Sequence, residues 1–424
     1  MNISFKKKNI YIFVFILVYK LVLDFVYIEF VHKIYSYSIF SLEFNLNKYF
    51  ISFIWFFIIF CILPKDSKKP SFIFLQLHFI IMIIPMFTLY ALTNQSGFFM
   101  CLSSIFFITE CLIIRVFPDL KIIRVKNSKK IIYGIIFLIT GFVYFSMIRA
   151  NGQPSLKALN FNRVYEIRSA VKYPLLMGYM VQWQAKIINP FLITTSYIKG
   201  NKKMLFISVF LQVVLYLITA HKSFLLIPLA IVIVLNILKK KDFLTIGSLV
   251  APLGILCAFL VYKIFDYIMV PSLIIRRLLF VPAQLKFFYY DFFSKHEFLY
   301  FSEGLFGKIF GLNTPYSIKT ANMIGGLYLG SYETNANTGY IADAYANMGV
   351  FGMLIITLLF TFILILIDSL SKKISKELVI GLCLFSILSL NDGALFTTLL
   401  TGGLLLLIML LYLYSNAEEE VFKN

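Results

Sequence analysis

The sequence predicts an all-α polytopic membrane protein with about twelve transmembrane helices and two large loops on the outer side. Two observations support this. First, 60% of the 424 residues are hydrophobic and only 14% are charged, whereas a soluble domain has about half apolar and a quarter charged residues. Second, the apolar residues fall in runs close to the ~20 residues that a membrane core demands. We therefore expect one integral membrane domain over residues 1–424.

Apolar segments follow one another along the whole chain. The first follows Lys6-Lys7-Lys8, exceeds signal-peptide length and lacks a cleavage site of small residues, so we expect it to stay as a membrane anchor. The two segments that flank His221 are also compatible with one broken hairpin. The predicted spans are residues 9–31, 49–64, 71–92, 97–117, 131–149, 174–197, 204–220, 224–238, 243–263, 339–368, 378–393 and 395–414.

Clusters of basic residues predict the orientation of these spans. When the segments are threaded in order, every cluster falls on one side, and cytoplasmic loops are the ones that carry excess Lys and Arg. Both termini are then cytoplasmic, and the net charge of +19 needs no nucleic-acid partner. The clusters are Lys6 to Lys8, Lys65 with Lys68 and Lys69, Lys121 with Arg124, Lys126, Lys129 and Lys130, Lys199 with Lys202 and Lys203, Lys239 to Lys241, and Lys372 with Lys373 and Lys376.

Two long segments remain on the outer side. Residues 150–173 form the first outer loop and residues 264–338 the second, and structureless loops beyond about 15 residues are usually functional or disordered. Within the second loop, residues 278–293 are apolar but interrupted by Pro282. The Phe and Tyr residues beside Lys286 predict a short helix that lies in the membrane interface.

Both outer loops keep arginines that the positive-inside rule would place elsewhere. Arg163 and Arg168 lie in the first loop, and Arg276 and Arg277 in the second. The planar guanidinium grips phosphate oxygens in bidentate fashion, so these side chains suit a lipid-linked pyrophosphate. The alternatives are contacts with ordinary anionic headgroups or salt bridges to Glu166.

Two further positions are candidates for chemistry. His221 and Lys222 lie at a predicted outer turn, where they either contact phosphate and move a proton or serve the fold. Asp343 and Asn347 are four residues apart and share one helix face at the start of a span. A carboxylate inside a membrane span is a functional candidate, and the alternative is an interhelical hydrogen bond.

Other polar residues lie inside predicted spans. Lys20 and Asp24 are four apart in the first span and are interpreted as a self-neutralising pair. Glu110, Lys186 and Gln184 have no partner that the sequence identifies. The outer loops hold no acidic metal cluster, and we expect no metal site.

Four short segments resemble, in the same order, the Wzy-type O-antigen polymerases of bacteria, which are oligosaccharide repeat-unit polymerases. The span count and the two large outer loops extend the likeness along the chain, and a GT-C-like glycosyltransferase architecture is compatible with it. The segments are residues 164–168, 221–224, 276–285 with 289–293, and 338–352.

The resemblance implies a reaction on the outer face of a bacterial inner membrane, in lipopolysaccharide biosynthesis. The growing glycan would leave its undecaprenyl pyrophosphate and be transferred to the sugar end of a new lipid-linked repeat unit. No cofactor, nucleotide sugar or metal is implied. The implied partners are the lipid-linked oligosaccharide, membrane lipids, a chain-length regulator and a flippase, without nucleic acid.

With this reaction, the candidate residues take distinct roles. Asp343 or His221 would accept the proton of the acceptor hydroxyl. The residues assigned to the pyrophosphate are Arg163, Arg168, Arg276, Arg277 and Lys222. The residues assigned to the sugars are Tyr289, Tyr290, Tyr340, Tyr345 and Asn347.

Three other functions remain open. A lipid-linked oligosaccharide flippase would also have about twelve spans, but transporters tend to show internal repeats and sites at the midplane, and this sequence shows no repeat. An O-antigen ligase uses the same donor and transfers the glycan to lipid A-core. A purely structural subunit of a polysaccharide complex is the third.

Overall fold

The computed structural model describes residues 3–37, 39–123, 125, 128–160, 164–240 and 242–423. Within these ranges every regular element is a helix, apart from one isolated bridge between Glu43 and Thr93. The predicted all-α class is thereby confirmed for the part of the chain described.

The helices follow one another with short connections. In the first part they are α1 (Ile3–Val26), η1 (Tyr27–His32), α2 (Lys33–Tyr35), α3 (Leu46–Ile62), α4 (Pro70–His78), η2 (Phe79–Ile83), α5 (Ile84–Leu92), α6 (Gly97–Val116), α7 (Ser128–Asn151), η3 (Leu156–Leu159) and α8 (Val164–Ala170). The middle part contains α9 (Met177–Trp183), η4 (Gln184–Ile188), α10 (Asn189–Ile198), α11 (Lys202–Thr219), α12 (Lys222–Lys240) and α13 (Phe243–Phe265). The last part contains α14 (Met269–Pro271), η5 (Ser272–Phe280), α15 (Val281–Phe293), α16 (Gly304–Phe310), α17 (Thr320–Leu329), α18 (Tyr340–Leu370), α19 (Lys376–Leu388), η6 (Ser389–Asn391), α20 (Leu395–Leu400) and α21 (Leu404–Lys423).

Eight helical stretches in the described residues are long and apolar enough to cross a membrane. The chain is therefore a multi-pass helical membrane protein. Four of the twelve predicted segments are not among the eight. Three of them contain shorter helices, namely α3, α19 and the helix over residues 404–416. The fourth, from α9 to α10, carries Gln184, Lys186 and Asn189. The eight are Lys7–Tyr35, Pro70–Leu92, Gly97–Val116, Ser128–Asn151, Lys202–Thr219, Lys222–Lys239, Phe243–Phe265 and Tyr340–Leu370.

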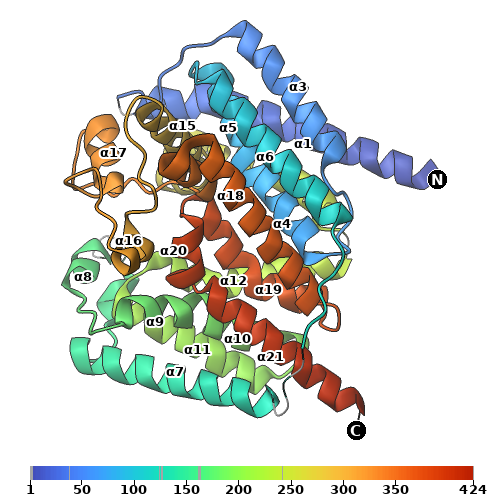
Figure 1. Ribbon diagram of the computed structural model, residues 1–424, viewed down its shortest axis with the longest axis vertical. Coiled ribbons are helices and arrows are strands. Elements are labelled where there is room, and N and C mark those ends of the chain that lie inside the picture. The colour runs from blue at the N-terminus through green and yellow to red at the C-terminus, as the bar shows by residue number, and fades with distance from the viewer. Residues whose placement is uncertain are drawn as a thin grey trace.

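The helices pack around two hydrophobic clusters. The larger one is built mainly by α1, α3 to α6, α13, α15, α18, α19 and α21, and the smaller by α7, α9, α11 and α12. In Figure 1, α1, α3, α5, α6 and α18 of the larger cluster lie in the upper part of the molecule, and α7, α9 and α11 of the smaller cluster lie in the lower part. The helix formed by η4 and α10 joins them, because Ile187 belongs to the larger cluster and Ile193 to the smaller.

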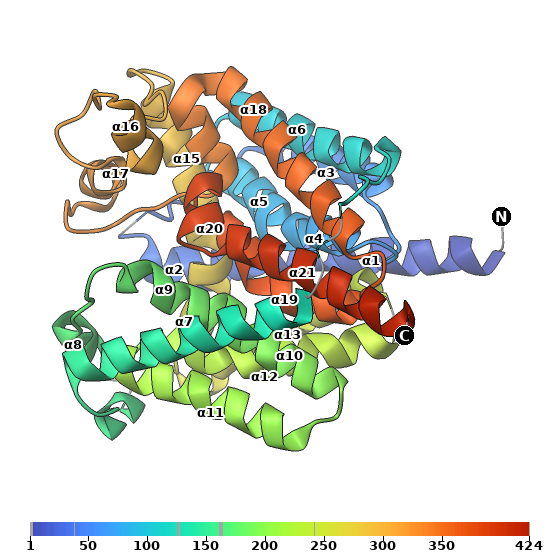
Figure 2. The same ribbon diagram turned by 60° about the horizontal axis from the view of Figure 1, so that its bottom comes forward.

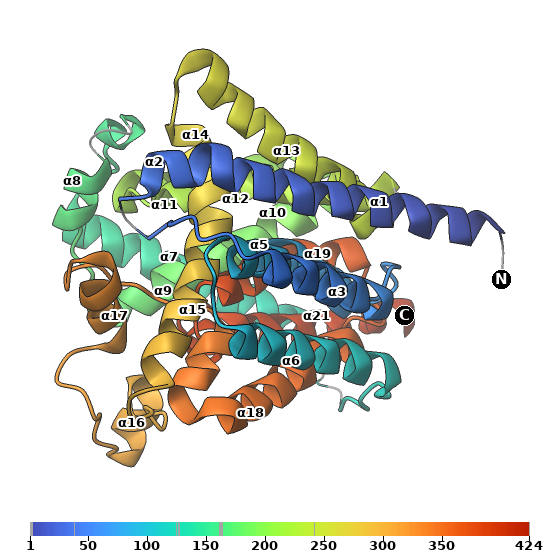
Figure 3. The same ribbon diagram turned by 90° about the horizontal axis from the view of Figure 1, so that it is seen from above.

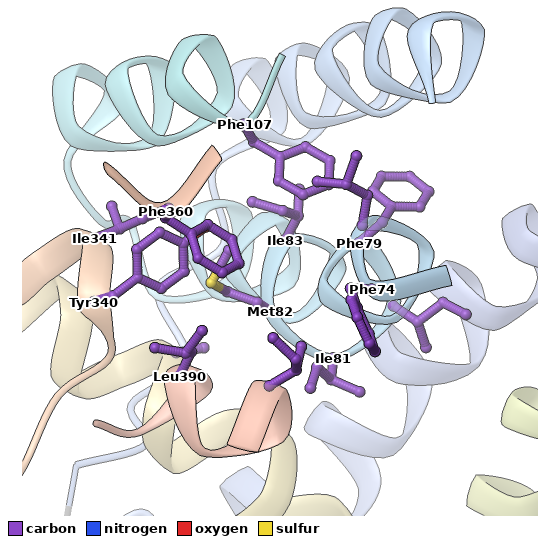
Figure 4. Close-up of a cluster of buried hydrophobic side chains, with 14 of the residues drawn as sticks. Phe74, Phe79, Ile81, Met82, Ile83, Phe107, Tyr340, Ile341, Phe360 and Leu390 are labelled. Atoms are coloured by element: carbon purple, nitrogen blue, oxygen red, sulfur yellow. The ribbon is translucent and has the colours of Figure 1, made fainter. Parts of the chain in front are cut away.

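Aromatic residues of distant segments fill the centre of the larger cluster. Figure 4 shows Phe79 and Met82 of η2 facing Phe107 of α6 and Tyr340 and Phe360 of α18. All of these side chains are buried. The start of α18 is thus fixed in the core. The positions of the residues in its next turns, including Asp343 and Asn347, are therefore fixed as well.

The loops that carry the basic clusters lie together at one end of the bundle. Asp119 accepts from Lys372 at 2.9 Å and lies 3.6 Å from Lys69, and Lys8 pairs with Asp242. Both chain ends lie at that end in Figures 2 and 3, while α8, α16 and α17 lie at the opposite end. This is the arrangement that the predicted threading requires.

The apolar stretch of the second outer loop is placed differently from the prediction. A helix does form, as η5 and α15, and Figure 3 shows it running across the long helices. Its aromatic side chains pack inside the protein on α6 instead of being exposed: Tyr290 stacks on Phe99 with ring centroids 5.0 Å apart, and Phe287 meets the same ring edge-on at 5.7 Å.

The interpretation of Lys20 and Asp24 as a self-neutralising pair is confirmed. The Lys20 ammonium lies 2.6 and 2.7 Å from the two carboxylate oxygens, and both residues are buried. Thr88 also donates to the Asp24 carboxylate, at 2.7 Å. Each charge is therefore compensated inside the first span.

Breaking this pair from one side is expected to destabilise the protein strongly. Lys20→Met leaves the buried Asp24 carboxylate uncompensated and should lower the unfolding free energy by about 3–5 kcal/mol, whereas the double replacement Lys20→Met with Asp24→Leu should restore most of it. Urea unfolding in detergent measures both variants. Equal losses in the single and double variants would contradict this account.

Candidate functional site

Basic side chains from three separate elements come together at the outer-loop end. Arg168 lies on α8, Lys186 on η4, and His221 on the turn between α11 and α12. The charges of Arg168 and Lys186 both act on His221, and Tyr173 Oη lies 3.2 Å from His221 Nε2. Ala220, just before the histidine, has a left-handed backbone with φ of 52°, which turns the chain sharply here. We call Arg168, Lys186 and His221 the basic group.

His221 is electrically neutral at physiological pH. Burial of the imidazole, assisted by the charges of Arg168 and Lys186, lowers its pKa from 6.5 to about 4. A neutral imidazole next to cations can donate or accept a hydrogen bond but adds no charge. The positive charge of the basic group therefore comes from Arg168 and Lys186.

A buried lysine is linked to this group through the Asp392 carboxylate. Lys286 on α15 is fully buried, and its ammonium donates to Asn391 O at 2.6 Å, Asn391 Oδ1 at 3.0 Å and Pro282 O at 3.2 Å. The exposed Asp392 carboxylate acts on both Lys286 and Lys186. Gly339 is required beside this lysine, since a Cβ at that position would lie 2.9 Å from Lys286 Cε and 2.5 Å from Asn391 O.

A second, acidic group forms where α18 begins. Asp343 is partly buried, and the Glu303 carboxylate acts on it electrostatically. Asn347 Nδ2 donates to Asp343 O at 2.8 Å. Glu303 is itself fixed, because its Oε1 accepts from Thr320 N at 2.8 Å and from the Thr320 hydroxyl at 2.7 Å. Asp343 and Glu303 are called the acidic group below.

A kink in α18 holds the second outer loop over the acidic group. The backbone leaves helical geometry at Met348 and at Gly349, where φ is 59°. The loop docks there through hydrogen bonds from Phe301 N to Asn347 Oδ1 and from Tyr300 N to Asn347 O, each 2.9 Å long. A side chain at Gly349 would meet the Phe298 ring at 2.9 Å, so a glycine permits this close contact.

One helix joins the two groups. Lys286 and Tyr289 are three residues apart on α15 and so lie about one turn apart on the same side of it. The Asp392 carboxylate acts electrostatically on the Lys286 ammonium, and the Asp343 and Glu303 carboxylates act on the Tyr289 hydroxyl. Helix α15 thus carries residues that interact electrostatically with Asp392 and with the acidic group.

Among the described residues, the arginines of the sequence-based assignment have different surroundings. Arg163 lies outside the described residues. Arg276 is held elsewhere: its Nε donates to Ser272 Oγ at 3.1 Å and its guanidinium lies 4.3 Å from the Tyr35 ring centroid. Arg277 is exposed on the same π-helix. Only Arg168 belongs to the basic group, with Lys222 half-buried next to His221 in sequence.

Most of the tyrosines assigned to sugars are core residues. Tyr340 is fully buried and donates to the Glu110 carboxylate at 2.9 Å, which gives Glu110 the partner that the sequence does not reveal. Tyr289 is buried and donates to Ala336 O at 3.0 Å. Tyr345 is buried against Tyr290, with ring centroids 4.9 Å apart. Only Tyr290, which is half-buried, keeps exposed ring surface.

The sequence assignment missed three charged residues of this region. From the sequence, Lys186 has no identifiable partner, Lys286 only accompanies aromatic residues, and Asp392 receives no role. Two signals were available: a lysine inside an apolar run requires compensation, and the Asn-Asp-Gly sequence at 391–393 interrupts two apolar segments.

The described residues contain no group of three or more His, Cys, Asp or Glu side chains placed to hold a metal ion. Comparison of the chain with models of known protein families, with curated proteins and with solved structures found no match.

Proposed function

We propose that this protein is a glycosyltransferase that polymerises undecaprenyl-pyrophosphate-linked oligosaccharide repeat units, as the Wzy-type O-antigen polymerases do. The observation that carries the proposal is the presence of both a basic group and an acidic group at the outer-loop end of the bundle. A donor with a pyrophosphate leaving group needs cations at one end and a proton acceptor at the other, and the chain supplies both.

The basic group would bind the pyrophosphate of the donor. Arg168 can make two parallel hydrogen bonds to phosphate oxygens, and Lys186 adds a point charge. As the glycosidic bond to the pyrophosphate breaks, negative charge grows on the leaving oxygen. Fixed cations near that oxygen stabilise the transition state, and one such donor is worth about 3 kcal/mol.

Asp343 would act as the proton acceptor. The acceptor hydroxyl oxygen forms a bond to the anomeric carbon of the donor, the bond from that carbon to the pyrophosphate oxygen breaks, and the hydroxyl proton passes to the Asp343 carboxylate. His221 suits this role less well, since its cationic neighbours oppose protonation. Its neutral ring would orient the pyrophosphate by a hydrogen bond.

The proposed location is the bacterial inner membrane, with both termini cytoplasmic and the site on the outer face. The meeting of the basic loops and both chain ends at one end of the bundle supports this orientation through the positive-inside rule. The site lies at the opposite end, where a lipid-linked unit would arrive after translocation.

Reconstitution tests this function directly. The full-length protein in liposomes containing undecaprenyl-pyrophosphate-linked repeat units should form linked repeat units and release undecaprenyl pyrophosphate without nucleotide sugar. Movement of the lipid-linked units between leaflets without glycan growth would assign a flippase instead. Growth that appears only when lipid A-core is supplied, with one glycan per core, would assign a ligase.

The pKa of His221 makes the pH profile informative. With a pKa lowered to about 4, the ring stays neutral from about pH 8 down to about pH 5.5 and gains its proton only well below that range. His221→Gln should therefore leave the shape of the wild-type pH profile unchanged near pH 6.5. A break near pH 6.5 that disappears in His221→Gln would contradict a neutral histidine.

A further inference from the structure

The end of the bundle opposite the candidate active site holds a separate basic pocket. Its volume is about 310 Å³. It lies where α4 and α19 begin and where α18 ends. The lining residues are Lys68, Lys69, Pro70, Asp119, Asp368, Ser371, Lys372, Ile374 and Lys376.

The two carboxylates of the pocket are already engaged by protein groups. Asp119 is held by Lys372 at 2.9 Å and Lys69 at 3.6 Å, and the hydrogen bond from Lys372 lowers its pKa, so it stays ionised. Asp368 is buried and accepts from Ser71 N at 3.0 Å and from the Ser71 hydroxyl at 2.6 Å. Both carboxylates thus have partners other than Lys68 and Lys376.

Two lysines of the pocket are left over. Within the part of the chain that the structure describes, neither Lys68 nor Lys376 forms an ion pair, although both line the cavity. The first residues of α4 and α19, Pro70 and Lys376, also line it. The N-terminus of α4 already binds the Asp368 carboxylate through Ser71 N, so the helix dipole that adds to the lysine charges and favours an anion is that of α19.

The position of the pocket along the membrane normal indicates which anion can reach it. Pro70 begins one candidate span, Pro70–Leu92, and Asp368 lies in the last turn of another, Tyr340–Leu370. The ends of membrane spans lie at the level of the lipid headgroups. Basic pockets between helices at this level bind anionic headgroups.

We infer that this pocket binds the phosphate group of an anionic phospholipid through Lys68 and Lys376. The inference is independent of the proposed polymerase activity, because it concerns the opposite end of the bundle. Inorganic phosphate is the other source of the same chemical group.

Native mass spectrometry of the full-length protein, purified and delipidated, tests this inference. Phosphatidylglycerol should bind and phosphatidylcholine should not. The double variant Lys68→Ala with Lys376→Ala should bind phosphatidylglycerol about thirtyfold more weakly, the effect of two lysine charges beside an anionic headgroup. A matched control, Lys202→Ala with Lys203→Ala, removes two exposed lysines near the same end outside the pocket and should bind like the wild type.

Each outcome has a defined meaning, provided that the variants share the thermal unfolding midpoint of the wild type. Selective loss in the pocket variant supports the inference. Displacement of the lipid by excess inorganic phosphate would assign the site to free phosphate, and retention would assign it to the lipid. Unchanged binding in the pocket variant, or equal losses in both variants, would overturn the inference. If the alanine variant unfolds, Lys68→Gln with Lys376→Gln is used instead, because it retains most of the side-chain volume. Its phosphatidylglycerol binding is measured and interpreted in the same way.

Discussion

Asp343→Asn is expected to reduce polymer formation by about 10²- to 10⁴-fold, the usual contribution of a general base. The amide keeps the size of the side chain, and the hydrogen bond from Asn347 Nδ2 to the Asp343 backbone oxygen remains. The fold of α18 should therefore be retained while the proton acceptor is lost. Polymer length and amount on a gel, in a strain complemented with the variant, measure the effect.

Asp291→Asn is the matched control for this variant. Asp291 is also an outer-end carboxylate, but it is engaged by Lys295 at 2.6 Å and by the Tyr328 hydroxyl at 2.6 Å, away from the acidic group. Its replacement should leave polymer formation within about twofold of wild type, since such exposed pairs contribute little. Wild-type polymer from Asp343→Asn at equal membrane levels would remove Asp343 from the mechanism.

Lys186→Ala is expected to lower kcat for polymerisation by about 10²- to 10³-fold, the loss typical of one transition-state donor. Lys186 is half-buried and forms no ion pair among the described residues. Its charge interacts electrostatically with both His221 and Asp392. Its charge is thus available to a pyrophosphate. Assays in liposomes with purified lipid-linked units give kcat and KM separately.

Two companion variants separate charge from structure. Lys186→Arg retains the charge and should recover part of the activity. Lys308→Ala removes an exposed lysine of α16 at the same end of the bundle and should leave kcat unchanged. A fall in kcat that is equal for Lys186→Ala and Lys308→Ala would show that general surface charge, rather than the basic group, attracts the substrate.

The sequence predicted the spans well where an apolar run stands alone. The long helix from Lys7 to Tyr35 and the helix from Gly97 to Val116 follow from hydrophobic stretches of bilayer length, although each stretch contains charged residues such as Lys20 or Glu110. The segment around Lys186 was harder to interpret, because a helix that joins two packed groups can carry polar residues that a lipid-facing helix cannot.

Burial against other helices was not predictable from local sequence. The apolar stretch around Pro282 carries the aromatic residues expected of an interfacial helix, yet Phe99 of α6 covers it. Likewise, Glu110 finds Tyr340 across 230 residues of chain. Such pairings depend on which helices become neighbours, and composition and periodicity do not contain that information.

The candidate site was predictable only in part for the same reason. Asp343 and His221 were found because a carboxylate and an imidazole at span ends are unusual. The arginines were grouped by side of the membrane alone, and the structure separates Arg276, held on Tyr35, from Arg168. A shared side does not determine which loops approach each other.

The most direct test of the central claim is a surface-polysaccharide gel of a strain that lacks this gene. A polymerase predicts lipid A-core carrying a single repeat unit with no ladder of longer chains, restored by the wild-type gene. Bare core with undecaprenyl-linked units accumulating on the inner leaflet would instead indicate a flippase, and accumulation of long lipid-linked polymer on the outer leaflet would indicate a ligase. An unchanged ladder would contradict a role in polymerisation altogether.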